Sequence, residues 1–274
     1  MTFHDICRIV KVRTRRRKRG ASKMKLVEIF YWFVLYSAIG WAYESILCSI
    51  TQRKLVNRGF LVGPVCPVYG FGALIIIFCL GGEKDNLLTL FLSSMVLTTV
   101  LEYLTSWLLE TFFHAKWWDY SKYRFNLNGR VCLLGAVVFG VLSVLLIQWI
   151  HPFISGLVAK MNPVFMLWLG GVIFGVLVCD LIFTVRSILK LNGKLQEIQT
   201  AINDFKQQMT EASEQRRQQF IERFEASEFN TKHIKALAER KKFQEKRLLK
   251  AFPKLKSLHY EDALEKIKSI IYKK

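Results

Sequence analysis

Five stretches of the chain are long and apolar enough to cross a membrane. Each is close to the roughly 20 residues that an α-helix needs to span a hydrocarbon core of ~30 Å. Buried helices of a soluble protein would have shorter runs with amphipathic patterns. We therefore expect an all-α, polytopic integral membrane helical bundle with about five transmembrane helices. The five stretches are Leu26–Ile50, Phe60–Leu80, Leu87–Phe113, Val131–Ile150 and Pro163–Val185.

Charge is separated from the apolar residues along the sequence. The 274 residues are 52% hydrophobic, yet the net charge is +19, a combination that is unusual for a soluble domain. Residues 24–185 carry 10 basic and 8 acidic residues, whereas residues 1–23 carry 9 and 1, and residues 187–274 carry 20 and 12. We divide the chain into a basic N-terminal extension (1–23), a membrane domain (24–186), a cytoplasmic helix or coiled coil (187–250) and a short amphipathic helix (251–274).

Loop charge predicts the orientation, because Lys and Arg resist translocation. The loops 51–63 and 114–130 each carry a net charge of +3, and the tail from Ser187 carries 20 − 12 = +8. The loops 81–86 and 151–162 carry only −1 and +1. We therefore expect the two +3 loops and the tail to face the cytoplasm.

The basic residues 1–23 conflict with this orientation, since five crossings would leave them outside. Either translation begins at Met24, which we favour, or the second stretch is re-entrant and both ends lie inside. If residues 1–23 are translated, they have the composition of a disordered arm for anionic lipid or nucleic acid. The second stretch is also a poor continuous helix, because it contains several helix-breaking residues. These are Gly63, Pro64, Pro67, Gly70 and Gly72.

The first and second halves of the apolar region share a weak internal repeat. The sequence G-x-V-C occurs at Gly63–Cys66 and again at Gly129–Cys132, and each copy is followed by Phe-Gly. Membrane carriers are often built from such repeats, with sites at the interface between the copies. The alternative is that glycines recur by chance in apolar helices.

We single out four acids inside the apolar stretches, where a charge near the centre costs at least ~2.5–3.5 kcal/mol. On the third stretch two of them continue a polar series with a spacing of four, which predicts one slowly drifting helical face directed at a partner helix or a cavity. Arg58 and Arg130 are candidate countercharges, and Arg130 is the expected partner of Glu102. The group serves either as a substrate or ion pathway or as buried ion pairs. The acids are Glu44, Glu102, Glu110 and Asp180, and the series is Ser94, Thr98, Glu102, Ser106 and Glu110.

The loop 114–130 is polar and aromatic. Trp117, Trp118, Tyr120 and Tyr123 are typical of an interfacial aromatic belt. His114 beside Glu110 suggests a proton relay or a metal ligand, although a lone His next to a membrane is usually neither. Asp119, Asn128 and Arg130 can fix the shape of the loop or meet a ligand.

The tail carries a heptad seam over about three heptads, with charged residues at the other positions. We expect a coiled coil, either with another copy of the chain or with a cytoplasmic partner. The alternative is a solvated helix that pairs with nothing. The seam residues are Leu191, Leu195, Ile198, Ile202, Phe205, Met209 and Ala212.

No C-x-x-C pair and no G-x-x-x-x-G-K-[ST] sequence occurs in the chain. The sequence therefore offers no metal or redox motif and no P-loop of its own. We expect no metal, no cofactor and no specific nucleic-acid partner, and we disfavour an enzyme.

Several of these stretches resemble the bacterial family called putative ABC-transporter type IV, or CmpB-like, membrane proteins. The resemblance covers roughly Lys25–Pro152 and rests on FYWFVLYSAIGWAYES, VNRGFLVGPVCPVYGFG, VLEYLTSWLLE and FHAKWWDYSKYRFNLNGRVCLLG. Members start close to the first span, which supports Met24 as the start. The motif positions are Glu44, Asn57, Arg58, Gly59, Pro64, Pro67, Tyr69, Gly70, Glu102, Trp117, Trp118, Asp119, Tyr120, Asn128, Gly129 and Arg130.

The resemblance implies a permease subunit of the bacterial cell membrane that works with a separate ATPase. It supplies no catalytic assignment for the motif positions and no substrate. Two other functions stay open. One is an intramembrane enzyme acting on lipid or isoprenoid headgroups, with Asp119, His114 or Glu102 as acid or base. The other is a scaffold whose tail recruits a cytoplasmic partner.

Overall fold

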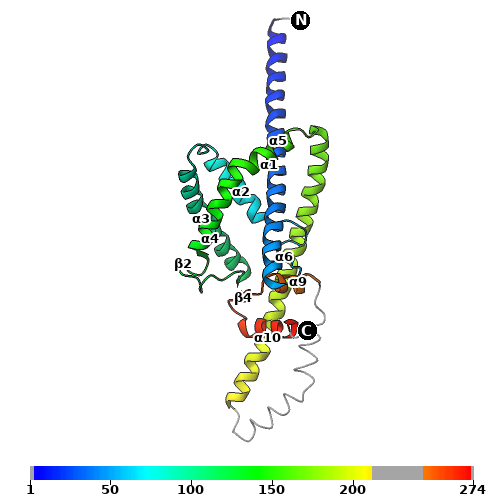
Figure 1. The fold of residues 1–274 in the computed structure, drawn as a ribbon. Coiled ribbons are helices and arrows are strands. Elements are labelled where there is room, and N and C mark those ends of the chain that lie inside the picture. The colour runs from blue at the N-terminus through cyan, green and yellow to red at the C-terminus, as the bar shows by residue number, and fades with distance from the viewer. Residues whose placement is uncertain (1–2, 212–242, 273–274) are drawn as a thin grey trace. The chain divides into compact units, whose positions relative to one another are not determined.

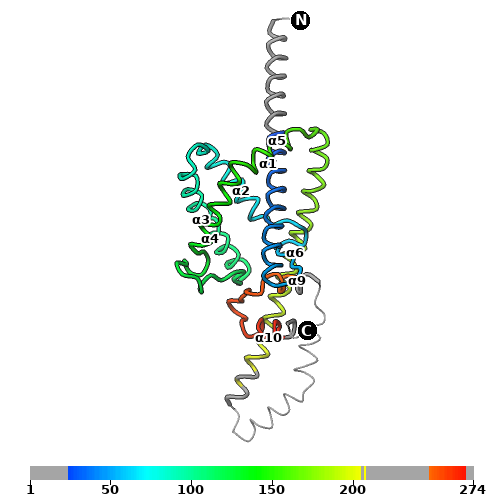
Figure 2. Tube along the Cα trace, in the orientation of Figure 1, coloured from blue at the N-terminus to red at the C-terminus, as the bar shows by residue number. Residues whose placement is uncertain are grey.

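The computed structural model describes the backbone of residues 3–211 and 243–272 and the side chains of residues 24–204, 207 and 247–269 (Figures 1 and 2). Within these residues the chain is mainly helical. The larger helices are α1 (Phe3–Gln52), α2 (Pro67–Leu80), α3 (Leu87–Phe113), α4 (Leu133–Leu145), η1 (Leu146–Ile150), α5 (His151–Ala159), α6 (Pro163–Glu211), α9 (Phe243–Ala251) and α10 (Glu261–Tyr272).

Four helical segments of the described chain are long and apolar enough to cross a membrane. They confirm the expected all-α membrane bundle, and the third predicted stretch matches α3 at both ends. The segments are Met24–Gln52, Leu87–Phe113, Leu133–Ala159 and Pro163–Asp204.

The chain divides into two compact units, which we describe separately. Unit 1 comprises residues 1–44, 63–99 and 134–179, and unit 2 comprises residues 45–62, 100–133 and 180–274. Each unit has its own apolar core.

In unit 1, α2 packs antiparallel against α1. Tyr69 lies against Gly40, where a Cβ would come within 2.2 Å of its ring, and the rings of Phe71 and Phe33 are 4.8 Å apart. Gly70 allows an equally close approach, since a Cβ there would lie 2.2 Å from the Ser37 hydroxyl oxygen. Successive residues of α2 therefore contact successively earlier residues of α1, which shows that the two helices are antiparallel.

The second apolar stretch is only partly helical. We expected a span over Phe60–Leu80, but α2 begins at Pro67 and has 14 residues. Pro64 and Pro67 have no N–H to donate, so a helix cannot run through them without loss. The N–H of Cys66 instead donates to the carbonyl of Ser37, at 2.9 Å. The predicted break in the second stretch is therefore observed, as an irregular stretch followed by a short helix.

The fourth apolar stretch is longer than expected. We predicted Val131–Ile150, but helix continues through α4, η1 and α5 to Ala159. The five residues of η1 form a π-helical turn directly before His151 and Pro152. Pro152 cannot donate to the carbonyl of residue 148, and a locally widened helix accommodates that loss.

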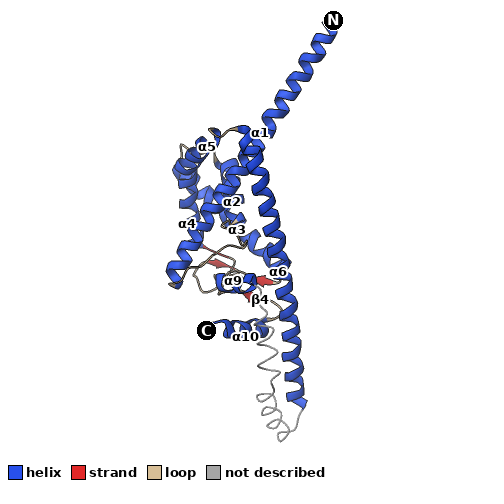
Figure 3. Ribbon diagram, turned by 90° about the vertical axis from the view of Figure 1, so that its right-hand side faces the viewer, coloured by secondary structure: helices blue, strands red, loops and turns tan. Residues whose placement is uncertain are grey.

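In unit 2, the C-terminal segment (residues 243–272) packs on α6 and on the loop that follows α3. Leu248, Leu249 and Leu264 are fully buried with Ile188, Leu191 and other α6 residues. Two small antiparallel sheets lie in this unit (Figure 3). β1 (Ala115–Lys116) pairs with β4 (Lys256–Ser257), and β2 (Asn126–Leu127) pairs with β3 (Val131–Cys132).

The first members of the heptad seam are covered by the chain itself. Leu191, Leu195 and Ile198 are each at most 4% exposed and belong to the core that includes the C-terminal segment. The side chains of Phe205 and Met209, and all of Ala212, lie outside the described residues. The coiled coil with a partner stays a prediction for that later part of the tail.

Candidate functional site

A polar pair in unit 1 joins α2 to α1. The hydroxyl of Tyr69 on α2 donates to the carboxylate of Glu44 on α1, at 2.9 Å. Tyr69 lies two residues after Pro67, the first residue of α2. The pair therefore joins the start of the short helix to the C-terminal half of the first span.

The polar series on α3 faces inward, as predicted. Ser94, Thr98, Ser106 and Glu110 are all buried, and Glu102 is half-buried. The hydroxyl of Thr98 donates to the carbonyl of Ser94 within the helix. This face of α3 is therefore turned toward protein rather than lipid.

At the C-terminal end of α3, a salt bridge joins Glu110 to Arg130. The guanidinium donates to both carboxylate oxygens, at 2.6 and 3.3 Å. Arg130 also donates to the hydroxyl of Tyr103 at 2.8 Å, and the amide of Asn128 donates to the same hydroxyl at 3.1 Å. The hydrogen bond to Glu110 raises the pKa of Arg130 above its usual value. A forked pair of this kind fixes orientation as well as charge.

Our expectation that Arg130 pairs with Glu102 is therefore wrong: its salt bridge is to Glu110. Helix geometry gives the reason. Residues seven apart differ by only about 20° around an α-helix, whereas residues eight apart differ by about 80°. Tyr103 and Glu110 thus share one face that Arg130 can reach, and Glu102 lies around the helix from it.

The loop of residues 56–62, which we call the motif loop, is held at each end by side chains of unit 2. The N–H of Val56 donates to Ser49 Oγ, and the N–H of Arg58 donates to Ser45 Oγ. The N–H of Val62 donates to the carboxylate of Asp180, at 2.9 Å. The loop also closes on itself, because the side-chain amide of Asn57 donates to the carbonyl of Val62.

The C-terminal segment inserts an arginine into the motif loop. Arg247 on α9 donates to the carbonyl of Gly59 at 2.9 Å, of Phe60 at 3.0 Å and, more weakly, of Asn57 at 3.5 Å. Burial lowers the pKa of Arg247 to about 10, and Asp180 offsets part of this effect. Main-chain dipoles and the negative charge of Asp180 compensate this half-buried cation.

Arg58 of the motif loop makes the reciprocal contact. Its guanidinium donates to the carbonyl of Ala251 at 2.5 Å and lies over the ring of Phe252, with 4.6 Å to the centroid. Arg58 thus contacts the C-terminal segment. Its role as a countercharge to the acids in the spans stays a prediction.

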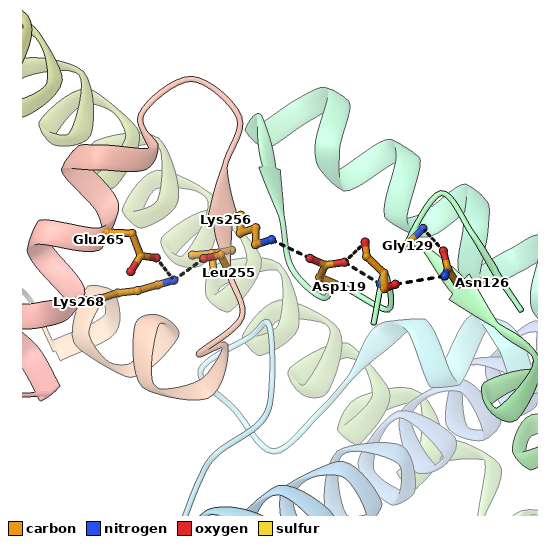
Figure 4. A network of polar contacts seen from close by, with 8 residues as sticks. Asp119, Asn126, Gly129, Leu255, Lys256, Glu265 and Lys268 are labelled. Atoms are coloured by element: carbon orange, nitrogen blue, oxygen red, sulfur yellow. Dashed lines mark hydrogen bonds and ion pairs between the residues drawn. The ribbon is translucent and has the colours of Figure 1, made fainter. Parts of the chain in front are cut away.

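Asp119 joins the loop after α3 to the C-terminal segment (Figure 4). Its carboxylate accepts from Lys256 at 2.8 Å and from the N–H and hydroxyl of Ser121. The bond from Lys256, followed by those from Ser121, holds the pKa of Asp119 well below its usual range. A carboxylate with these partners orders the loop and is a poor proton donor at neutral pH.

The two tryptophans of this loop belong to the core. Trp117 is 4% exposed and packs against Phe60, Phe113 and Phe252, with ring centroids 4.9 to 6.1 Å apart. Trp118 packs on the same core and donates from its ring nitrogen to the carbonyl of Arg130. Trp117 is therefore a core residue and not an exposed belt residue, because Phe252 of the C-terminal segment packs on it. For the half-buried Trp118 the interfacial belt stays a prediction.

The other motif positions have local roles. His114 is exposed, has a φ of 50°, and its carbonyl accepts from the N–H of Leu258. Tyr120 donates its N–H to the carbonyl of Gly129, whose own φ is 69°. In the part of the chain that the structure describes, no group of three His, Cys, Asp or Glu residues is placed to hold a metal ion.

Three residues of this region were missed in the sequence. Tyr103 had a signal, since it lies seven residues before Glu110 and hence on the same helical face. For Lys256 the only signal was its positive charge, which does not identify Asp119 as its partner. Arg247 had no usable signal, because its described hydrogen bonds go to main-chain carbonyls, which every residue carries.

A comparison with protein-family models matches residues 31–185 to a family described as "Putative ABC-transporter type IV". The match contains both loops described above and ends before the C-terminal segment. No curated protein and no solved structure gives a significant match.

Proposed function

Because the chain belongs to the family described as "Putative ABC-transporter type IV", we propose that it is the membrane-spanning, permease-like subunit of an ABC-type transporter. The observation that carries the proposal is that the family match coincides with an array of apolar helices that has inward-facing polar groups. Since the sequence has no P-loop, ATP hydrolysis has to come from a separate ATPase chain.

We place the protein in the bacterial cell membrane with five crossings. The antiparallel packing of α2 on α1 supports a second crossing that is completed by the irregular stretch before Pro67. Non-helical backbone at membrane depth is tolerated where protein covers it. Loop charge then puts Met24 outside and the C-terminal tail in the cytoplasm.

Reporter fusions test this orientation. Fusions after Asp85 and Lys160 are expected to report the outside, and fusions after Lys122 and at the C-terminus the cytoplasm. A periplasmic signal after Lys122 would overturn the orientation.

Glu44 and Glu102 are the acids that we propose for a substrate or ion pathway. Both lie well inside their helices: Glu44 is about 12 Å from Gln52 and Glu102 about 16 Å from Phe113, at ~1.5 Å per residue. Acids at such depth are expensive and usually functional. The bonds of Glu110, Asp119 and Asp180 to arginine, lysine or main-chain groups favour a structural role for those three.

Copurification in mild detergent tests the proposed function. The expected result is a stoichiometric ATPase whose activity depends on this chain and falls in a Glu102→Gln variant that folds normally. The hydroxyl-to-carbonyl bond of Thr98 offers a control, since Thr98→Ser keeps that bond and is expected to keep activity. Purified protein without an ATPase, but with turnover of lipid headgroups, would instead favour the enzyme.

A further inference from the structure

The loop after α3 ends in a rigid hairpin, residues 121–132. β2 and β3 pair Asn126 with Cys132, and the side chain of Asn126 donates to the carbonyl of Tyr123 and accepts from the N–H of Gly129. Phe125 has a φ of 53°, in a region that bulky residues rarely adopt. The tip of the hairpin is therefore fixed in one shape, at some cost in backbone strain.

Main-chain and side-chain bonds tie this hairpin to the ends of two membrane spans. The N–H of Leu133, the first residue of the span Leu133–Ala159, donates to the carbonyl of Phe125 at 3.1 Å. Asn128 bonds the hydroxyl of Tyr103, which lies about 15 Å before the end of α3 at ~1.5 Å per residue. The hairpin therefore lies beside the C-terminal half of α3 and directly before the start of the span Leu133–Ala159.

The surface of the tip combines apolar and basic groups. Phe125 is 79% exposed and Leu127 is 57% exposed. Lys122 and Arg124 beside them are exposed, and neither forms an ion pair with any residue that the structure describes. The sequence from Tyr120 to Arg130 contains no acid.

We infer that this tip is a binding site for anionic phospholipid, with Phe125 and Leu127 in the interfacial layer and Lys122 and Arg124 on headgroup phosphates. Apolar side chains flanked by snorkelling cations match the interface of a bilayer in both polarity and charge. A protein partner would also fit the apolar pair, but it would not explain a tip held at the ends of two spans. The inference does not depend on coupling to ATP.

Lipid selection measures the role of the two cations. The purified protein is mixed with equal amounts of phosphatidylglycerol and phosphatidylcholine in detergent, and bound lipids are counted by native mass spectrometry. The wild type is expected to retain phosphatidylglycerol preferentially. Each cation near a lipid surface is worth about fivefold, so loss of both lowers the preference by about 30-fold. The charge reversal Lys122→Glu with Arg124→Glu is expected to lower it by at least that factor.

The matched control is Lys250→Glu with Lys266→Glu, which makes the same charge change at two exposed lysines of the C-terminal segment. It is expected to keep the preference. Equal loss in both double variants, or no loss in either, would overturn the site.

A second measurement reports insertion of the tip. The photo-crosslinker p-benzoylphenylalanine, placed at Phe125, is expected to form lipid adducts in vesicles that contain phosphatidylglycerol. Adducts to protein alone would show a protein interface and overturn the proposal. Displacement of the lipid by millimolar inorganic phosphate would likewise overturn it, because the site would then bind a soluble anion.

Discussion

Replacing Arg247 with alanine should release the C-terminal segment from the motif loop. The change removes two well-formed hydrogen bonds from a cation, at 2.9 and 3.0 Å, and leaves the carbonyl of the buried Gly59 without its donor. Hydrogen bonds to charged groups contribute about 1.5–3 kcal/mol each. Relief of the buried charge offsets part of the loss, so we expect docking to weaken by about 2–4 kcal/mol.

Hydrogen exchange gives the assay. The N–H of Leu258 donates to the carbonyl of His114 and so reports docking directly. A loss of ~2–4 kcal/mol corresponds to exchange that is about 30- to 1,000-fold faster at this amide, if opening of the segment governs its exchange.

Two variants sharpen the result. Arg247→Lys keeps the positive charge but loses the planar guanidinium that binds two carbonyls, so exchange at Leu258 is expected to be intermediate between the wild type and Arg247→Ala. Lys250→Ala, on the exposed side of the same helix, should change exchange little. If the Leu258 amide in Arg247→Ala stays within about threefold of the wild type, the arginine is not what holds the segment.

Three further changes follow from the geometry. Glu110→Gln leaves the half-buried Arg130 without its carboxylate and should lower stability by about 1–3 kcal/mol, seen as a lower melting temperature in detergent; an unchanged melting temperature would contradict a stabilising pair. Gly70→Ala should destabilise the packing of α2 on α1, whereas Gly72→Ala should not, because a Cβ at Gly72 meets nothing within 4 Å; equal melting temperatures would refute the close contact. The lowered pKa of Asp119 means that its bond to Lys256 contributes above the unfolded pKa of 3.8 and is lost as pH falls through the lower folded pKa. The protection of amides in the docked segment, measured against their intrinsic exchange rate at each pH, should therefore fall in strong acid in the wild type but not in Asp119→Asn.

The sequence predicted the elements that depend on local pattern. The apolar length of α3 and the four-residue spacing of its polar series were enough to give its bounds and its buried face. The start of α2 was misplaced because hydropathy continues through Pro64, where hydrogen bonding cannot. Length and polarity thus predicted the spans better than the places where backbone geometry interrupts them.

Contacts between segments that lie far apart in the chain could not be predicted from the sequence. The seam that begins at Leu191 and Leu195 correctly predicted a covered face, but periodicity cannot tell whether a second chain or the same chain covers it. The same holds for Trp117, whose composition suits an interface and which lies under the C-terminal segment instead.

The contact of Arg247 has an unusual consequence for how substitutions in the motif loop behave. The groups that it binds are the carbonyls of Gly59 and Phe60, and a carbonyl survives any exchange of side chain. The hydrogen bonds of Arg247 therefore depend on the backbone path of the loop and not on the identity of most of its side chains. A change of side chain that preserves the path should leave the bonds of Arg247 intact, while a change that bends the path, for example at Asn57, should resemble the loss of Arg247 itself. A genetic screen for docking of the C-terminal segment would then tolerate more substitutions at the loop positions whose carbonyls bind Arg247 than at position 247 itself.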